Sequence, residues 1–195
     1  MEAILNFDWA VFQWVENNLW NPVLDKIFPI ITIFGNKGIF WIILALVLCL
    51  SKKYRRVGII MAVAIVLDGV SVNLIMKNVF ARPRPFDLEL WKDVFQYPGL
   101  IKKPVDFSFP SGHTVVCFAG AVSLFAAEKK WMGVVGIILA ILVAFSRIYL
   151  HVHYCTDVLA GVVIGILCGV FAILIVNAVE KKIQKNKLKK LETKG

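Results

Sequence analysis

Two histidines and one aspartate have residue types and a spacing that suit nucleophilic and acid–base chemistry. His153 and Asp157 are four positions apart, so they would share one face if a helix begins there. Asp157 can then accept a hydrogen bond from one ring nitrogen of His153, which leaves the other nitrogen free to attack an electrophile. His113 stands at the start of another expected helix and is a candidate general acid.

Three basic residues could bind an anion next to these groups. Lys77, Arg84 and Arg147 each fall near the end of an apolar segment. Arginine and lysine hold phosphate oxygens and offset the negative charge that develops in a transition state. Backbone N–H groups where a helix opens at Gly112, together with the Ser111 hydroxyl, would add a phosphate cradle. These residues predict a phosphate site with acid–base capacity.

The elements that must position these residues are expected to be membrane-spanning helices. Hydrophobic residues make up 59% of the chain, and several segments approach the roughly 20 apolar residues that span a bilayer. The expected spans are residues 57–76, 112–127, 131–150, 158–179 and a shorter segment at 38–50. We therefore predict an all-α polytopic membrane helix bundle with five to six transmembrane helices.

The chain is expected to have three parts. Residues 1–36 would form N-terminal interfacial helices or an extra span, because residues 7–20 show a helical pattern rich in aromatic residues. Residues 37–179 would form the transmembrane core, and residues 180–195 a basic cytoplasmic tail. Within the core, Gly161, Gly165 and Gly169 form a ridge of small residues that predicts close helix packing.

The distribution of charge predicts which end of the bundle carries the chemistry. The formal net charge is +9, and more than half of the Lys and Arg fall at 52–56, 129–130 and 181–194, each just beyond an apolar segment. Such clusters are typical of cytoplasmic loops, and a basic tail beside anionic lipid requires no nucleic acid. The candidate site residues then lie at the extracytoplasmic ends of the helices, and the C-terminus lies in the cytoplasm. The loop over residues 81–110 is expected on the same side, and its length suggests that it has a function.

Three blocks of the sequence resemble a family signature. Residues 77–85 read KNVFARPRP, residues 109–113 read FPSGH, and residues 146–157 read SRIYLHVHYCTD. In this order they resemble the K-x6-R-P, P-S-G-H and S-R-x5-H-x3-D blocks of the type 2 phosphatidic acid phosphatase family. The resemblance covers roughly residues 57–179 and implies a helical membrane bundle with its active site at the outer face.

The resemblance also implies a role for each site residue. His153 would attack phosphorus and form a phosphohistidine, Asp157 would orient His153, and His113 would protonate the leaving oxygen and later activate water. The phosphoryl oxygens would be bound by Lys77, Arg84, Arg147, Ser111 and Gly112. The family requires no metal and no cofactor, and the sequence agrees, because no acidic cluster of the kind that holds magnesium falls on this side.

The substrate implied is a lipid phosphate. Undecaprenyl pyrophosphate is our first expectation, and phosphatidic acid, phosphatidylglycerol phosphate and isoprenyl monophosphates are close alternatives, because the blocks recognise phosphate and not the lipid tail. Soluble vanadium haloperoxidases share the same blocks, but the spanning helices argue against their activity. An alternative of another class is a transporter or a non-catalytic anion-binding membrane protein, which the lack of an internal repeat disfavours. The oligomeric state stays open.

Several polar residues near the blocks are given lesser roles, and the cysteines none. His151 is expected to be structural or to lie at the edge of the substrate, and Arg82 to support the site. For Asp68, in the middle of a span, we favour an interhelical hydrogen bond, with a functional role as the alternative. The four cysteines lack a metal-ligand spacing, so neither a disulfide framework nor a zinc site is expected.

Overall fold

Helices make up all the regular structure of the described residues. The computed structural model describes residues 2–91 and 93–192. The α-helices are α1 (Glu2–Leu19), α2 (Leu24–Ile31), α3 (Ile39–Leu50), α4 (Arg55–Asp68), α5 (Lys77–Phe80), α6 (Gly112–Leu124), α7 (Trp131–Tyr149) and α8 (Cys155–Glu192). The remaining helical segments are η1 (Thr32–Gly38), η3 (Pro85–Asp87) and η4 (Glu89–Trp91), which are 3₁₀, and η2 (Gly69–Met76), which is π-helical. The η1 segment is interrupted by a kink at Asn36 and Lys37, and we call it the η1 loop. The predicted all-α fold is confirmed.

Helix α6 forms the centre of the bundle. It packs against α8, α7 and α4, and most of its residues are buried. A helix surrounded in this way is apolar on all sides, as the α6 sequence is. Trp41 of α3 fits against α6 at Gly120, where a Cβ would lie only 2.1 Å from the indole ring.

The glycines of α8 allow it to approach α6 closely. A Cβ at Gly161 would lie 2.9 Å from Thr114 Cβ, and a Cβ at Gly165 would lie 2.6 Å from the Val115 carbonyl oxygen. A Cβ at Gly169 would similarly meet the Val122 side chain at 2.6 Å. The packing role predicted for this ridge is confirmed.

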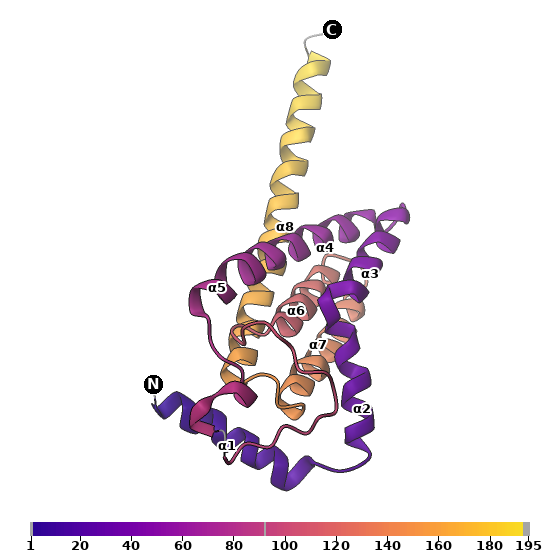
Figure 1. Cartoon of the computed structure of the whole chain (residues 1–195). Helices are drawn as coiled ribbons and strands as arrows, with labels where there is room; N and C mark the ends of the chain where they lie inside the picture. The colour runs from indigo at the N-terminus through magenta and orange to yellow at the C-terminus, as the bar shows by residue number, and fades with distance from the viewer. Residues whose placement is uncertain (1, 92, 193–195) are drawn as a thin grey trace.

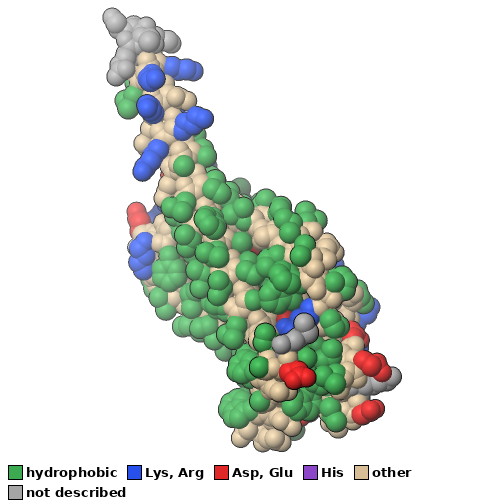
Figure 2. Space-filling view, turned by 90° about the vertical axis from the view of Figure 1, so that its left-hand side faces the viewer, with side chains coloured by type: hydrophobic (Ala, Val, Ile, Leu, Met, Phe, Trp, Pro, Cys, Tyr) green, Lys and Arg blue, Asp and Glu red, His purple; other side chains and the backbone are tan. Residues whose placement is uncertain are grey.

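The outside of the bundle is apolar, as a membrane protein requires. Four stretches are long and apolar enough to cross a membrane, namely Leu24–Leu50, Arg55–Trp91, Trp131–Tyr149 and Cys155–Leu191, and Gly112–Leu124 is a shorter apolar helix. Exposed large hydrophobic side chains such as Leu74 and Leu174 cover these helices, and Figure 2 shows the resulting apolar surface over one face of the bundle. The chain is a multi-pass membrane protein.

The N-terminal segments frame one end of the bundle. Helix α1 lies across the end opposite to the C-terminus (Figure 1). The segments α2, η1 and α3 follow one another directly and form the first of the four apolar stretches. The boundary predicted at residue 36 falls inside this stretch, and the division of the chain into three parts stays a prediction.

Two ion pairs tie the basic stretches together at the other end. Lys53 Nζ lies 3.5 Å from Glu128 Oε2, and Arg56 Nε lies 3.1 Å from Glu180 Oε2. Helix α8 continues past the bundle at this same end (Figure 1). Its extension carries Lys181, Lys182, Lys185, Lys187, Lys189 and Lys190.

The π-helical segment η2 continues α4 without a break. Its hydrogen bonds follow an i→i+5 pattern, which is rare and often lies at functional sites. Residues five positions apart therefore share a face, so Asp68 and Asn73 point to the same side of the helix. The sequence pattern did not predict this segment.

Candidate active site

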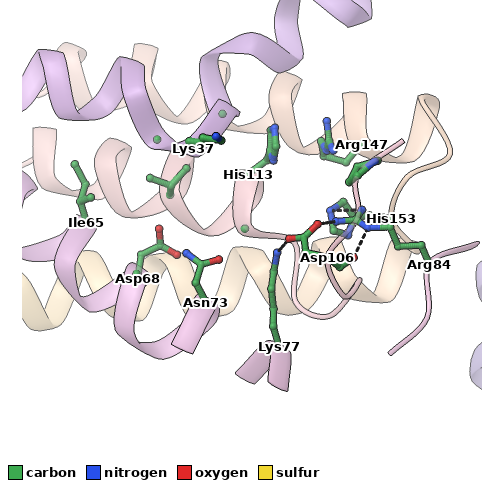
Figure 3. Close-up of a pocket in the computed structure, with 16 residues that line it drawn as sticks. Lys37, Ile65, Asp68, Asn73, Lys77, Arg84, Asp106, His113, Arg147 and His153 are labelled. Atoms are coloured by element: carbon green, nitrogen blue, oxygen red, sulfur yellow. Dashed lines mark hydrogen bonds and ion pairs between the residues drawn. The ribbon is translucent and has the colours of Figure 1, made fainter. Parts of the chain in front are cut away.

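A cavity of about 390 Å³ collects most of the predicted site residues. Its lining residues come from η1, α4, η2, α5, α6, α7 and the outer loops. They are Gly35, Lys37, Gly38, Ile65, Asp68, Gly69, Asn73, Lys77, Arg84, Pro104, Asp106, Gly112, His113, Val116, Arg147 and His153. Figure 3 shows Lys37, His113 and Arg147 entering from one wall, and Asp68, Asn73 and Lys77 from the opposite wall.

His153 is buried and has a defined tautomer. Arg84 Nη1 lies 3.3 Å from His153 Nε2, and because a guanidinium only donates, Nε2 must be the ring nitrogen with the free lone pair. Nδ1 then carries the proton and donates to Asp157 Oδ2 across a long 3.4 Å contact. Burial, together with the charges of Arg84, Arg147 and Lys77, holds the pKa of His153 well below its ordinary value. A neutral imidazole with a free Nε2 lone pair is the form that can act as a nucleophile.

Asp157 is fixed by donors from several segments. Its Oδ2 accepts hydrogen bonds from the Ser108 hydroxyl and, at 3.1 Å, from the Tyr154 N–H. Its Oδ1 accepts one from Arg82 Nη1 at 2.6 Å. The other terminal nitrogen of Arg82 donates to Asp8 Oδ2 at 2.8 Å, so helix α1 joins this network. The sequence assigned Arg82 only a supporting place and missed Ser108 and Asp8, whose contacts depend on segments far apart in the chain.

Lys77 and Arg84 share one carboxylate, that of Asp106. Arg84 Nη2 donates to Asp106 Oδ1 at 2.6 Å, Arg84 Nε donates to the Asp106 carbonyl oxygen at 2.7 Å, and Lys77 is ion-paired with Oδ2. Burial would raise the pKa of Asp106, but the two cations outweigh it and hold the pKa below its ordinary value. In this structure a carboxylate therefore occupies the place between the two cations that a phosphate would need. The sequence did not single out Asp106.

Arg147 brings an unsatisfied donor to the cavity. It is buried, and its Nη1 donates to the Thr32 hydroxyl at 2.5 Å. Its Nε has no hydrogen-bond partner among the described residues. A buried N–H without a partner is costly, and an anion in the cavity would supply the missing acceptor.

His113 is placed by the η1 loop of the N-terminal segment. Its Nε2 lies 3.0 Å from Asn36 Oδ1. Because a side-chain carbonyl only accepts, Nε2 of His113 carries a proton. Gly35 lies directly against the ring, where a Cβ would be 2.7 Å from His113 Cδ2. Sequence analysis did not single out this loop, whose one signal is the glycine-flanked run Gly35-Asn36-Lys37-Gly38.

Ser111 and Gly112 stand at the start of α6 but differ in their access to the cavity. Gly112 lines the cavity, whereas Ser111 does not. The Ser111 N–H donates to the Asp157 carbonyl oxygen at 3.2 Å, and its hydroxyl accepts a hydrogen bond from Thr114 at 3.0 Å. The structure thus brings Gly112 to the anion site, while Ser111 links α6 to α8 behind it.

The structure contradicts the role expected of Asp68 and favours the structural one of the two roles expected of His151. Asp68 Oδ1 is buried without a hydrogen-bond partner among the described residues, so the expected interhelical hydrogen bond is wrong, and Asp68 lines the cavity instead. His151 lies outside the cavity, packed between Phe12, Trp20 and Phe95. Burial lowers the pKa of His151 to about 4, against an opposing hydrogen bond to the Gln96 carbonyl oxygen.

The donor set of the cavity suits an anion better than a metal ion. Across residues 2–91 and 93–192, no group of three or more His, Cys, Asp or Glu side chains could hold a metal. The cavity has four cationic side chains, Lys37, Lys77, Arg84 and Arg147, and two carboxylates. Cations that converge on a buried histidine are the arrangement expected for phosphoryl transfer.

Comparisons with known proteins agree with this chemistry. The PAP2 superfamily matches residues 53–181, which include all three sequence blocks. An undecaprenyl-diphosphatase from Sulfolobus acidocaldarius is 32% identical over 166 residues, or 84% of this chain and 76% of that protein. Undecaprenyl-diphosphatase BcrC from Bacillus subtilis is 31% identical over 149 residues, or 76% of this chain and 73% of that protein.

A solved structure extends the agreement to the fold. The transmembrane PAP2-type phosphatidylglycerolphosphate phosphatase from Bacillus subtilis matches with a TM-score of 0.72 and 25% identity. The match covers 94% of this chain and 89% of that one. The family resemblance of the three blocks is therefore confirmed, and the chain is a membrane phosphatase that belongs to the PAP2 superfamily.

Proposed function

We propose that this lipid phosphate phosphatase acts without a metal through a phosphohistidine on His153, at the extracytoplasmic face, and that undecaprenyl diphosphate is its preferred substrate. The observation that carries the mechanism is the hydrogen bonding of His153. Nδ1 faces Asp157, and Nε2 faces Arg84 at the phosphate-binding end of the cavity. This arrangement leaves one ring nitrogen both unprotonated and directed at the anion site.

In the first step, His153 Nε2 attacks phosphorus and the bond from phosphorus to the leaving oxygen breaks. The positive charge that develops on the imidazole is stabilised by Asp157. Lys77, Arg84 and the free Nε–H of Arg147 bind the phosphoryl oxygens, so Asp106 must give up its contacts to the incoming phosphate. His113, protonated on both ring nitrogens once the anionic substrate is bound, donates its Nε2 proton to the leaving oxygen and becomes a neutral imidazole. In the free enzyme this Nε2–H is hydrogen-bonded to Asn36.

In the second step, water attacks the phosphohistidine and the phosphorus–nitrogen bond breaks. His113 has lost its Nε2 proton in the first step, so it can accept a proton from the water. Inorganic phosphate then leaves, His153 recovers its lone pair, and Asp106 returns to Lys77 and Arg84. The cations of the cavity supply the positive charge throughout, which supports a reaction independent of added metal.

The choice of substrate rests on the relatives. Two proteins more than 30% identical to this chain are named as undecaprenyl-diphosphatases. Phosphatidylglycerol phosphate is the main alternative, because the solved relative is a phosphatidylglycerolphosphate phosphatase. The cavity is formed by side chains that would bind phosphate in either lipid.

The side of the membrane follows from the separation of charge. The basic stretches lie together at one end of the bundle, where Lys53 joins the α3–α4 turn to the α6–α7 turn and Arg56 joins α4 to α8. The extension of α8 lies at that end too (Figure 1). If this end is cytoplasmic, the cavity opens on the extracytoplasmic side.

Phosphate release by the detergent-solubilised protein tests the reaction. We expect turnover of undecaprenyl diphosphate in excess EDTA, and an acid-labile phosphorylated protein when the reaction is quenched early. His153→Ala should abolish both signals while the protein elutes as a folded species. Lys102→Gln, an exposed residue of the outer loop that does not line the cavity, serves as the control. A strict need for magnesium, or normal turnover in His153→Ala, would refute the mechanism.

Cysteine labelling tests the topology separately. In a cysteine-free background, a cysteine at Lys102 should react with an impermeant reagent added to intact cells, and a cysteine at Lys187 should not. The opposite pattern would place the cavity in the cytoplasm and rule out the proposed side of action.

A further inference from the structure

Lys37 is the one cation of the cavity that the proposed mechanism leaves without a task. It stands in η1, on the same wall as His113 and beyond it as seen from Arg147 (Figure 3). Its side chain is exposed to the cavity and forms no hydrogen bond or ion pair with the described residues. By contrast, Lys77 and Arg84 are held by Asp106, and Arg147 by Thr32.

The backbone at Lys37 is unusual for a lysine. Its φ of 48° and ψ of 17° lie in the left-handed region, which lysine rarely occupies. The next residue, Gly38, is also left-handed, with a φ of 67°. Residues held in such conformations often lie at functional sites, because the surrounding structure must enforce them. Here Gly35, packed on the His113 ring, and Asn36, hydrogen-bonded to His113, hold the loop in place.

The order of groups along the cavity assigns this lysine to the leaving group. His153 attacks from one side of the phosphorus, so the leaving oxygen lies on the opposite side, where His113 protonates it. Asn36 is hydrogen-bonded to His113, and the next residue, Lys37, carries the unpaired amine. A group attached to the leaving oxygen therefore lies nearest Lys37.

We propose that Lys37 binds the inner phosphate of a lipid diphosphate and so makes the enzyme prefer diphosphates to monophosphates. In a diphosphate, the atom beyond the leaving oxygen is a second phosphorus with its own negatively charged oxygens. A lysine ammonium is a suitable partner for those oxygens. In a monophosphate, the same place holds only the carbon chain, which gains nothing from an ammonium.

The other charges at this end of the cavity make binding of the inner phosphate depend on Lys37. Asp68 faces the cavity from the opposite wall, and its carboxylate would repel a second phosphate. Lys77 is the other nearby cation, and it pairs with Asp106 in the free enzyme and with the transferred phosphate in the mechanism. Without Lys37, the inner phosphate would meet Asp68 with little compensation.

A matched pair of substrates tests the inference, which rests on the proposed reaction. We compare kcat/KM for farnesyl diphosphate and farnesyl monophosphate, which have the same tail and differ by one phosphate. Lys37→Gln should lower the ratio of the two values at least about tenfold, the effect expected for one lost charge-assisted hydrogen bond. Lys37→Arg should keep the ratio, because it retains the charge. Lys102→Gln, which removes an exposed lysine outside the cavity, should also keep it.

Binding of methylenediphosphonate, whose P–C–P bridge is not hydrolysed, gives a readout apart from turnover. Lys37→Gln should weaken its inhibition more than that of inorganic phosphate. An unchanged ratio and unchanged inhibition in a folded, active Lys37→Gln protein would overturn the role of Lys37 and leave the proposed reaction standing. Failure of the wild-type protein to hydrolyse either lipid would instead refute the proposed function, and this inference with it.

Discussion

Arg82 Nη1 lies 2.6 Å from Asp157 Oδ1, and its Nη2 lies 2.8 Å from Asp8 Oδ2, so one guanidinium joins two fully buried carboxylates. Its Cζ also lies 3.6 Å from the centre of the Tyr154 ring. Asp157 in turn holds the Nδ1 proton of His153. Arg82 is therefore a positioning residue that acts on the nucleophile through Asp157 and anchors helix α1 to the start of α8.

Replacing Arg82 should impair both turnover and stability. Arg82→Gln leaves two buried carboxylates without a cation, which typically costs about 3–5 kcal/mol. We also expect kcat to fall by about tenfold or more, equivalent to about 1.4 kcal/mol in the barrier. KM should change little, because Arg82 does not line the cavity. Asp8→Asn, which keeps Arg82 next to Asp157, should lower kcat less. Equal losses of kcat in the two variants would contradict the positioning role.

Leaving groups of different basicity should separate His113 from His153. A lipid alkoxide needs a proton to leave, whereas p-nitrophenolate needs little help. His113→Ala should therefore lose far more rate on a lipid monophosphate than on p-nitrophenyl phosphate, and His153→Ala should lose both. Rapid-quench measurement of the first step is required, because His113 also acts in the second. An equal loss on both substrates in His113→Ala would remove the acid role.

Removing the carboxylate of Asp106 should tighten the binding of inorganic phosphate. Asp106 pairs with Lys77 and Arg84 in the free enzyme, so it competes with any anion for the same two cations. We expect the inhibition constant of phosphate to fall by about tenfold in Asp106→Asn, the effect of about 1.4 kcal/mol. Asp87→Asn, an exposed acid of the outer loop, is the control. Weaker inhibition in Asp106→Asn would show that Asp106 supports the anion site and does not compete for it.

His151 should make the protein less stable in mild acid. Its pKa is lowered from 6.5 to about 4 in the folded protein, so the unfolded chain binds more protons between these values. Stability is therefore lost as the pH falls through this window, by about 2 kcal/mol at pH 5. His151→Asn keeps a donor for the Gln96 carbonyl oxygen and tolerates the left-handed backbone of this position, where φ is 54°.

The measurement is the apparent melting temperature in detergent at pH 7.5 and pH 5. Glu16 lies 3.7 Å from His151 Nε2, and burial raises the pKa of Glu16. Protonation of Glu16 in mild acid therefore favours the folded protein, opposite to the effect of His151. The difference between the wild-type protein and His151→Asn isolates the histidine. If the melting temperature of the two proteins falls by the same amount between pH 7.5 and pH 5, groups other than His151 cause the loss of stability.

The sequence predicted the core of the site better than its rim. His153, His113, Lys77, Arg84 and Arg147 meet in one cavity, because each follows from a short block with a fixed place at the end of a helix. Asp106 and Asn36 have no local pattern that marks them, and only the folding of a loop and of η1 brings them to Lys77 and His113.

The place of Asp68 and Asn73 in the cavity was not predicted for a different reason: sequence analysis favoured an interhelical hydrogen bond for Asp68 and did not single out Asn73. A regular α-helix has a repeat of 3.6 residues, which separates positions five apart around the axis. The π-helical segment changes this repeat and turns both residues toward the cavity. No pattern in the sequence distinguished this stretch from an ordinary apolar span.

The η1 loop lines the cavity from outside the range of the chain that matches the PAP2 superfamily. Gly35, Lys37 and Gly38 line the wall next to His113, yet they precede residues 53–181, the range that the PAP2 superfamily shares. The shared range holds every residue that would touch the transferred phosphate. Part of the wall beyond His113, where the rest of the substrate would lie, comes from outside that range. If Lys37 binds the inner phosphate as proposed, substitutions in this loop should change which lipid phosphate this protein prefers and leave the chemistry of the three sequence blocks unchanged.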